Sequence, residues 1–314
     1  MISRSDFQSR ADWLAARTAN PYQIGASDWA TILGRNKFES AFSWFHRKRD
    51  RIEIAQSLPM ELGIELEPFI IRKFIEQTGR AVVTGYFTFT HSDYDFLSAT
   101  PDGLIDGALP LECKMTGALE DQLYVYNIQQ QAQIACMCVD SGALAILETG
   151  WRKQLTIFDN ARNDEWINAA LPRIIEMHDR LLNNDPPPID GSESTARALA
   201  MLHPRDTGEV VQGDGHAMMA IRELLIIKAQ IKQYEEYQAE HENRIKNTIA
   251  DATTLDCDGY SASWKFQTRA GQIVVPDDAR PVLDAHGIPY EIKGASEFRV
   301  LRVKEVKQRV RQAT

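Results

Sequence analysis

The 314-residue sequence has no long apolar run and only four cysteines. No stretch approaches the roughly 18 apolar residues that a membrane-spanning helix requires. Residues 1–10 are polar and do not resemble the apolar segment of a secretory signal. The cysteines form no C-x-x-C pair and no zinc-binding spacing. We therefore expect a cytosolic, reduced protein whose cysteines are mostly small buried residues.

The sequence also lacks an excess of basic residues. Its 35 lysines and arginines against 44 aspartates and glutamates give a formal net charge of −9. This balance argues against a protein that coats nucleic acid through bulk charge. It is compatible with an enzyme that holds nucleic acid in a local groove, because a bound cation reverses the field of its acidic ligands. Two basic clusters, residues 46–51 and 299–311, have an ordinary interpretation as solvated helix faces, which we prefer for the second.

Hydrophobic periodicity predicts an α/β (mixed α+β) protein with a mixed sheet flanked by helices. An Asp-Gly pair at residues 106–107 predicts a hairpin turn between two short extended segments. We expect helices over residues 6–17, 29–33, 41–51, 61–78, 119–137 and 164–183, and strands over 81–90, 94–100, 109–115, 143–148 and 154–158.

The best domain boundary is the Asp-Pro-Pro-Pro run at residues 185–188, because three prolines stop a helix and stiffen a connector. We predict a core over residues 1–185 and a C-terminal extension over 190–314 that packs on it. Within the extension we expect a polar loop over 191–215, a long amphipathic helix over 216–249, and short strands over 260–266 and 297–303.

The stretch from Thr100 to Lys114 contains candidate metal-binding and catalytic residues. Alternation along its second segment places Glu112 and Lys114 on one face, with Asp102 on the neighbouring segment. Two carboxylates suit a hard cation such as Mg²⁺, and a lysine can orient the attacking water or neutralise developing charge. These groups can cut a phosphodiester. The same pattern also fits an ordinary turn followed by a half-exposed strand with an ion pair.

Two helices offer further candidates near this stretch. Glu67 lies beside the apolar stripe of the helix over 61–78, where it can reach a sheet edge or simply face solvent. In the helix over 119–137, Gln129 and Gln133 lie four residues apart on one face and can hold a water or a phosphate oxygen. For Gln130 and Gln133 we prefer the interpretation as polar helix surface.

A phosphate site is predicted near the N-terminus. Ser27 is expected at the N-cap of the short helix that follows it, beside free backbone N–H groups. Arg17 can add a bidentate clamp. Ordinary helix capping is the alternative, and Ser27 can serve both purposes.

Six short motifs follow one another along the chain. They are Arg17, I-G-A-S-D (24–28) with L-G (33–34), G-I-E-L-E-P (63–68), T-P-D-G (100–103), L-E-C-K (111–114) and Y-N-I-Q-Q-Q (126–131). Their order resembles the lambda-exonuclease/YqaJ-type viral recombinase family, which belongs to the PD-(D/E)xK, restriction-endonuclease-like nucleases. The resemblance covers about residues 10–160.

The resemblance implies a restriction-endonuclease-like central sheet and a Mg²⁺-dependent exonuclease that degrades one strand of linear duplex DNA from its 5′ end. Two ions per site are implied, with Mn²⁺ as a substitute. The implied partners are duplex DNA with a 5′-phosphate, a single-strand annealing protein that takes the 3′ overhang, and further copies of the chain in a trimeric ring. The implied location is the cytoplasm of a bacterial host, with the gene carried by a phage or prophage.

The resemblance also implies a role for each matched residue. Cys113 departs from the usual apolar residue between Glu and Lys, and residues 190–314 extend beyond the matched part. The implied metal ligands are Asp102, Glu112 and the Cys113 backbone carbonyl, with Lys114 and Gln129 catalytic, Glu67 holding a second metal or water, Arg17, Ser27 and Gln131 binding the 5′-phosphate or DNA, and Met60 splaying the duplex end.

Two alternatives stay open. One is another nuclease of the same superfamily, either an endonuclease or an iron–sulfur exonuclease. A cluster needs four suitably placed thiolates, and Cys136 and Cys138 lie only two apart on a helix. The other is a non-catalytic scaffold that binds DNA ends, against which the full set of candidate residues argues.

Overall fold

The computed structural model describes residues 3–50, 52, 57–150, 154–257, 260–265 and 280–287. The chain divides into two compact units, Met1–His203 and Pro204–Thr314, and each is described by itself. The predicted domains, with a boundary near residues 185–190, stay a prediction. The strand expected over 297–303 and the basic cluster over 299–311 lie outside the described residues.

A five-stranded mixed sheet forms the centre of the first unit, which confirms the predicted fold class. Its strands β7 and β8 run parallel, while the other neighbouring strands run antiparallel. The parallel pair requires a crossover, and helix α5 (Leu119–Cys136) provides it. The strand order is β3 (Val82–Val83), β6 (Gly103–Ile105), β7 (Leu109–Thr116), β8 (Ser141–Glu148) and β9 (Leu155–Ala161).

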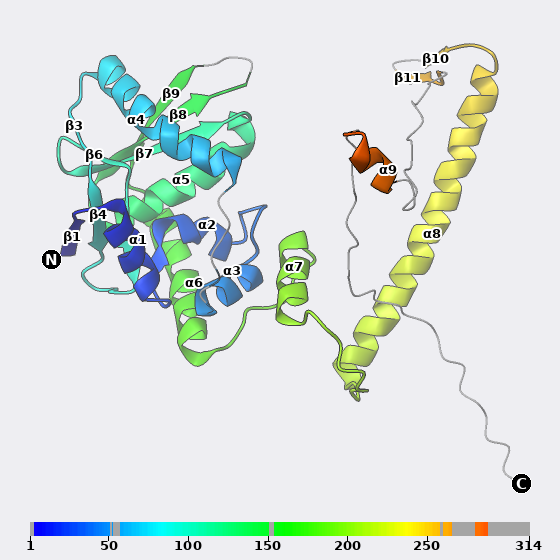
Figure 1. Ribbon diagram of the computed structural model, residues 1–314, viewed down its shortest axis with the longest axis horizontal. Helices are drawn as coiled ribbons and strands as arrows, with labels where there is room; N and C mark the ends of the chain where they lie inside the picture. The colour runs from blue at the N-terminus through cyan, green and yellow to red at the C-terminus, as the bar shows by residue number, and fades with distance from the viewer. Residues whose placement is uncertain are drawn as a thin grey trace, which may run out of the picture. The chain divides into compact units, whose positions relative to one another are not determined.

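Helices cover both faces of this sheet. Helix α4 (Leu58–Thr78) packs Ile70 and Phe74 against Leu111 and Cys113 of β7. Figure 1 shows α4 lying across strands β7 to β9, and α4 contacts all three. Helix α5 contacts β7 and β8 as well, and Glu112 of β7 accepts hydrogen bonds from Gln129 and Gln133 of this helix. The side chains of β7 therefore divide between two helices.

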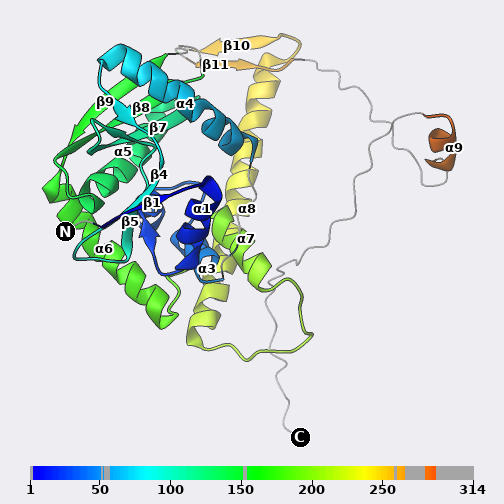
Figure 2. The same ribbon diagram turned by 60° about the vertical axis from the view of Figure 1, so that its left-hand side comes forward.

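A second, four-stranded sheet includes a strand that the sequence pattern did not predict. Strand β1 (Ser3–Phe7) pairs antiparallel with β4 (Tyr86–Thr90), as Figure 2 shows. The helix expected over 6–17 is shorter and is α1 (Arg10–Ala19). The sheet is completed by β5 (Leu97–Ala99) and β2 (Ile24–Gly25), in the order β1-β4-β5-β2.

The remaining helices of the first unit enclose an aromatic core that includes Trp29, Trp44 and Phe45. Helix α7 (Glu193–Leu202) lies within the polar loop predicted over 191–215, so that prediction is wrong for these residues, while residues 203–214 form no helix or strand. The side chain of Ser194 on α7 accepts a hydrogen bond of 3.2 Å from the backbone N–H of Ser40. These helices are the 3₁₀ turn η1 (Ala26–Asp28), α2 (Trp29–Ile32), α3 (Ala41–Arg49), α6 (Asp164–Asn183) and α7 (Glu193–Leu202).

The second unit begins with helix α8 (Gly215–Ile249), drawn in Figure 1 as one continuous rod, which confirms the predicted long helix. Strands β10 (Thr254–Cys257) and β11 (Tyr260–Ser263) follow as an antiparallel pair, and α9 spans Arg280–Ala285. Strand β11 covers part of the strand predicted over 260–266. In the part of the chain that the structure describes, no helix combines the length and apolar character needed to cross a membrane.

Candidate functional site

The hairpin between β6 and β7 positions the first carboxylate. Asp106 and Gly107 have φ values of 51° and 76°, which confirms the predicted tight turn. The hairpin register sets Asp102 beside Cys113, whose backbone N–H donates to Asp102 Oδ2 at 2.7 Å. The Asp102 N–H donates in turn to the carbonyl of Leu111 at 3.0 Å. Both bonds fix the Asp102 carboxylate next to strand β7.

Glu112 is the centre of the site. It lies on the face of β7 turned toward α5 and is only 2% exposed. Its Oε1 accepts a hydrogen bond of 2.6 Å from Lys114 Nζ and another from Gln129 Nε2. Its Oε2 accepts a hydrogen bond from Gln133 Nε2. One buried carboxylate is thus held by three donors, two of which the sequence placed at the site.

The third donor corrects a prediction. Gln133 and Gln130 are 1% and 0% exposed, so their interpretation as polar helix surface is wrong. Gln130 Nε2 donates to the backbone carbonyl of Pro110 at 3.2 Å. The four-residue spacing of Gln129 and Gln133 was the sequence feature that could have found this, because such residues share one helix face. Because these side chains are polar, the sequence pattern did not indicate that this helix face is buried.

Close packing between α5 and the sheet depends on Gly142 of β8. A Cβ atom there would lie 2.6 Å from Gln130 Nε2 and 2.9 Å from the carbonyl oxygen of Pro110. We expect Gly142→Ala to lower the free energy of unfolding by about 1–3 kcal/mol through overpacking. Thermal melts check this, with Gly63→Ala as the control. Gly63 lies in helix α4 with nothing within 4 Å of a new Cβ, so its replacement should not destabilise. Equal melting of the two variants would contradict the packing argument.

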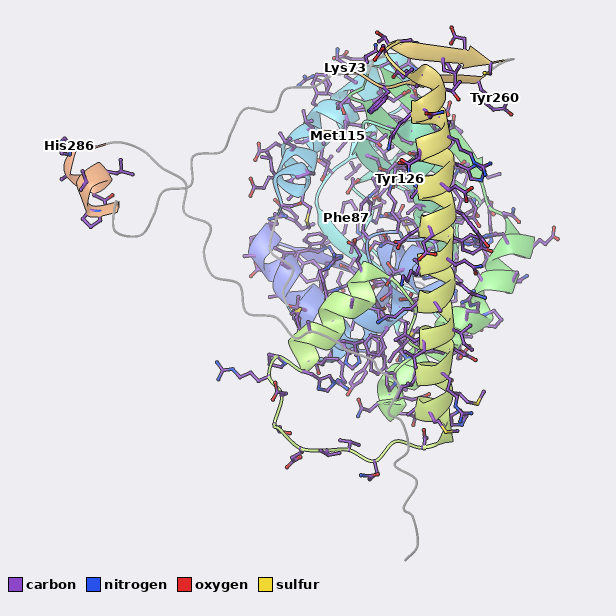
Figure 3. All side chains as sticks on the ribbon, turned by 90° about the vertical axis from the view of Figure 1, so that its right-hand side faces the viewer. Lys73, Phe87, Met115, Tyr126, Tyr260 and His286 are labelled. Atoms are coloured by element: carbon purple, nitrogen blue, oxygen red, sulfur yellow. The ribbon has the colours of Figure 1, made fainter. Side chains whose placement is uncertain are left out.

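The carboxylates of the site repel one another. Burial, reinforced by the charge of Glu112, raises the pKa of Asp102 well above its usual value. Burial and the charge of Glu112 also raise the pKa of Glu67, which places Glu67 of α4 within electrostatic reach of the site. Burial alone would lower the pKa of Lys114, but the charges of Glu112 and Asp102 outweigh it and raise that pKa. Lys114 Nζ also lies 5.8 Å from the ring centroid of Tyr126, a residue of α5 that is labelled in Figure 3.

This donor set fits a divalent cation. Asp102, Glu112 and the backbone carbonyl of Cys113 offer the oxygen ligands that Mg²⁺ prefers. A bound cation would favour the charged form of Asp102 and so oppose the burial and the charge of Glu112 that raise its pKa. Within the described ranges, no three or more His, Cys, Asp or Glu side chains gather as a metal-binding group. The candidate therefore consists of two carboxylates and a carbonyl.

Arg17 lies toward the same site. Arg17 is in the last turn of α1, and its guanidinium carbon is 4.6 Å from the ring centroid of Trp13 on the same helix. Enclosure lowers the pKa of Arg17, while the carboxylates of Asp28, Glu112 and Asp102 oppose this and favour its charged form. The residue predicted to receive a phosphate is thus electrostatically linked to the carboxylate pair.

Ser27 differs from the prediction in its local structure. It is exposed within the 3₁₀ turn η1, and the N-cap of α2 is Asp28, so the predicted N-cap role of Ser27 is wrong. Asp28 Oδ2 accepts a hydrogen bond of 2.9 Å from the backbone N–H of Gly25 and lies 3.2 Å from Lys48 Nζ. Asp28 thus orders the turn that carries Ser27.

Three other candidates make no hydrogen bond or ion pair with Glu112 or its three donors among the described residues. The amide of Gln131 donates to the carbonyl of Ala161 at 2.8 Å and accepts from the N–H of Asn163 at 2.9 Å. The structure therefore does not bring Gln131 to the site. Met60 is exposed in the first turn of α4. In the basic cluster over 46–51, Arg47 pairs with Glu39 at 2.6 Å, so part of its charge is neutralised within the protein.

Known proteins show what the chain is similar to. Residues 12–136 match the YqaJ-like viral recombinase domain, a span that contains every candidate site residue named above. The uncharacterized protein YqaJ of Bacillus subtilis (strain 168) is 26% identical over 321 aligned positions, which cover 98% of each chain. These matches confirm the family resemblance predicted from the order of the motifs.

Solved structures show similarity as well. An alkaline exonuclease, LHK-Exo from Laribacter hongkongensis, is 19% identical, covers 62% of this chain and all of its own, and has a TM-score of 0.46. A phage related exonuclease from Haemophilus somnus 129PT is 13% identical, covers 52% of this chain and 96% of its own, and has a TM-score of 0.41.

Proposed function

We propose, from the premise that residues 12–136 form a YqaJ-like viral recombinase domain, that this chain is a Mg²⁺-dependent deoxyribonuclease. It degrades one strand of linear double-stranded DNA from the 5′ end and leaves a 3′ single-stranded overhang for recombination by strand annealing. The observation that carries the proposal is the convergence of Lys114 and Gln129 on the buried carboxylate of Glu112, with Asp102 beside it.

Each residue has a chemical task in this proposal. Asp102, Glu112 and the Cys113 carbonyl hold the metal, and Glu67 holds a second ion or the water. A bound Mg²⁺ or Mn²⁺ lowers the pKa of water and stabilises charge on the phosphate. Lys114 orients the attacking water through its ammonium group and neutralises charge on the scissile phosphate. Gln129 donates to the same oxygen of Glu112 as Lys114 does, and so holds that carboxylate in the position in which it contacts Lys114.

The test is digestion of linear and closed circular duplex DNA with Mg²⁺ or with a chelator. The proposal predicts degradation of the linear DNA in Mg²⁺, no degradation with the chelator, and intact circles throughout. Cleavage of closed circles would favour an endonuclease instead. Metal-independent binding of DNA ends without turnover would favour a non-catalytic scaffold.

The 5′ direction depends on Arg17 and Ser27, which we propose to bind the terminal phosphate. We expect Arg17→Ala to remove most of the preference for a 5′-phosphorylated over a 5′-hydroxyl duplex, because the bidentate cation is lost. Initial rates on the two substrates measure this preference. Arg197→Ala is the control, since Arg197 is an exposed arginine on α7. An unchanged preference in Arg17→Ala would rule out this role.

The cellular setting follows the same proposal. The protein acts in the cytoplasm of a bacterial host, encoded by a phage or prophage, together with a single-strand annealing protein. It encircles duplex DNA as a homotrimer. Light scattering tests the last point: a particle of three chain masses supports the ring, and a monomer at micromolar concentration contradicts it.

A further inference from the structure

We propose that Gln133 is a positioning residue that fixes the orientation in which Glu112 binds the metal. This inference rests on the proposed metal-dependent nuclease function. The motifs behind the family resemblance end at residue 131, so they assign Gln133 no role.

The two oxygens of Glu112 are held differently. Oε1 accepts from both Lys114 and Gln129, whereas Oε2 accepts from Gln133. In the part of the chain that the structure describes, Gln133 is the single hydrogen-bond donor to Oε2. A carboxylate held at one oxygen can still rotate about its last bond. Gln133 supplies the second point that stops this rotation.

Gln133 makes this bond at a cost to the fold. Its side chain is 1% exposed, and its Oε1 has no hydrogen-bond partner within the described residues. A buried unpaired acceptor is destabilising, and an apolar side chain of similar size would avoid that cost. The amide cannot be turned around, because its carbonyl would then face the carboxylate of Glu112. The hydrogen bond to Glu112 is therefore the contribution that explains an amide at this position.

Gln130 offers a matched comparison. It lies on the same helix, is 0% exposed, and also has an Oε1 without a partner among the described residues. Its Nε2 donates to the carbonyl of Pro110 and not to Glu112. The two glutamines share their burial and their unpaired oxygen, and they differ in the group that they hold.

The experiment compares Gln133→Met with Gln130→Met in the full chain. Calorimetry with Mn²⁺ in the absence of DNA measures metal binding. The Mg²⁺ concentration that gives half-maximal digestion measures how much metal the reaction requires. We expect Gln133→Met to weaken Mn²⁺ binding by about tenfold or more, as the loss of a group that orients a metal ligand does. Its half-maximal Mg²⁺ concentration should rise, and excess Mg²⁺ should restore much of its rate. Gln130→Met should match the parent in both measurements.

Equal Mn²⁺ binding by the two variants, whether both are normal or both are weakened, would overturn the positioning role. If Gln133→Met fails to melt cooperatively, Gln133→Asn takes its place, because its shorter side chain keeps an amide but withdraws the donor from Glu112. A parent chain that neither binds Mn²⁺ nor digests DNA would overturn the proposed function, and this inference with it. If the parent chain binds Mn²⁺ and digests DNA, a difference between the two variants tests the role of Gln133 alone.

Discussion

Replacing Lys114 by alanine should slow digestion of linear duplex DNA by about 10²–10³-fold, the loss expected when one charge-stabilising donor is removed from an active site. Lys114 is the one cation in contact with Glu112 among the described residues, at 2.6 Å from its Oε1. The variant should still bind Mn²⁺, because the ligands Asp102 and Glu112 remain. The initial rate of nucleotide release in saturating Mg²⁺ is the measurement.

The matched control is Lys73→Ala. Lys73 is a lysine of the same unit that also pairs with a glutamate at 2.6 Å, but this pair, with Glu76, lies on the surface of α4. Its replacement should leave the rate unchanged. A Lys114→Ala variant that digests DNA at the parental rate would show that the site lies elsewhere.

Glu112→Gln should lower digestion by more than about 100-fold, which exceeds the usual effect of losing a group that only orients a ligand. The change removes a metal ligand and keeps nearly the same shape. It also removes a charge that raises the pKa of Asp102. We expect the fold to persist, because the neutral side chain no longer repels Asp102. We expect Mn²⁺ binding to be lost, because a carboxylate ligand of the metal has been removed. Calorimetry with Mn²⁺ and thermal melts measure the two effects separately.

Glu120→Gln controls for the same chemical change on an exposed glutamate in the first turn of α5. It should leave metal binding and digestion unchanged. If Glu112→Gln keeps Mn²⁺ affinity and activity, Glu112 is a structural acceptor for Lys114 and the two glutamines, and the metal site is assigned wrongly.

The alternation of β7 allowed much of the site to be predicted from the sequence. Period-two alternation separates Leu111 and Cys113 from Glu112 and Lys114, and the structure places the first pair against α4. The Asp-Gly turn fixes the register that brings Asp102 to Cys113. These features are local, so a short stretch of sequence carries them.

The features that were missed depend on contacts between distant segments. Strand β1 has no apolar alternation of its own and exists through backbone pairing with β4. Helix α7 lacks a long apolar stripe and docks on α3 through hydroxyl groups such as Ser194. The burial of Gln133 follows from its partner Glu112 on another element. Sequence periodicity reports apolar faces and cannot show a polar face that is buried by hydrogen bonds.

The central claim is that this site removes nucleotides from a 5′ DNA end. The most direct test is digestion of a linear 5′-phosphorylated duplex in Mg²⁺, with the label at the 5′ end in one sample and at the 3′ end in the other. The account predicts immediate release of the 5′ label, while the 3′ label stays in a long strand until late. Release of the 3′ label first, or of both labels together, would contradict it.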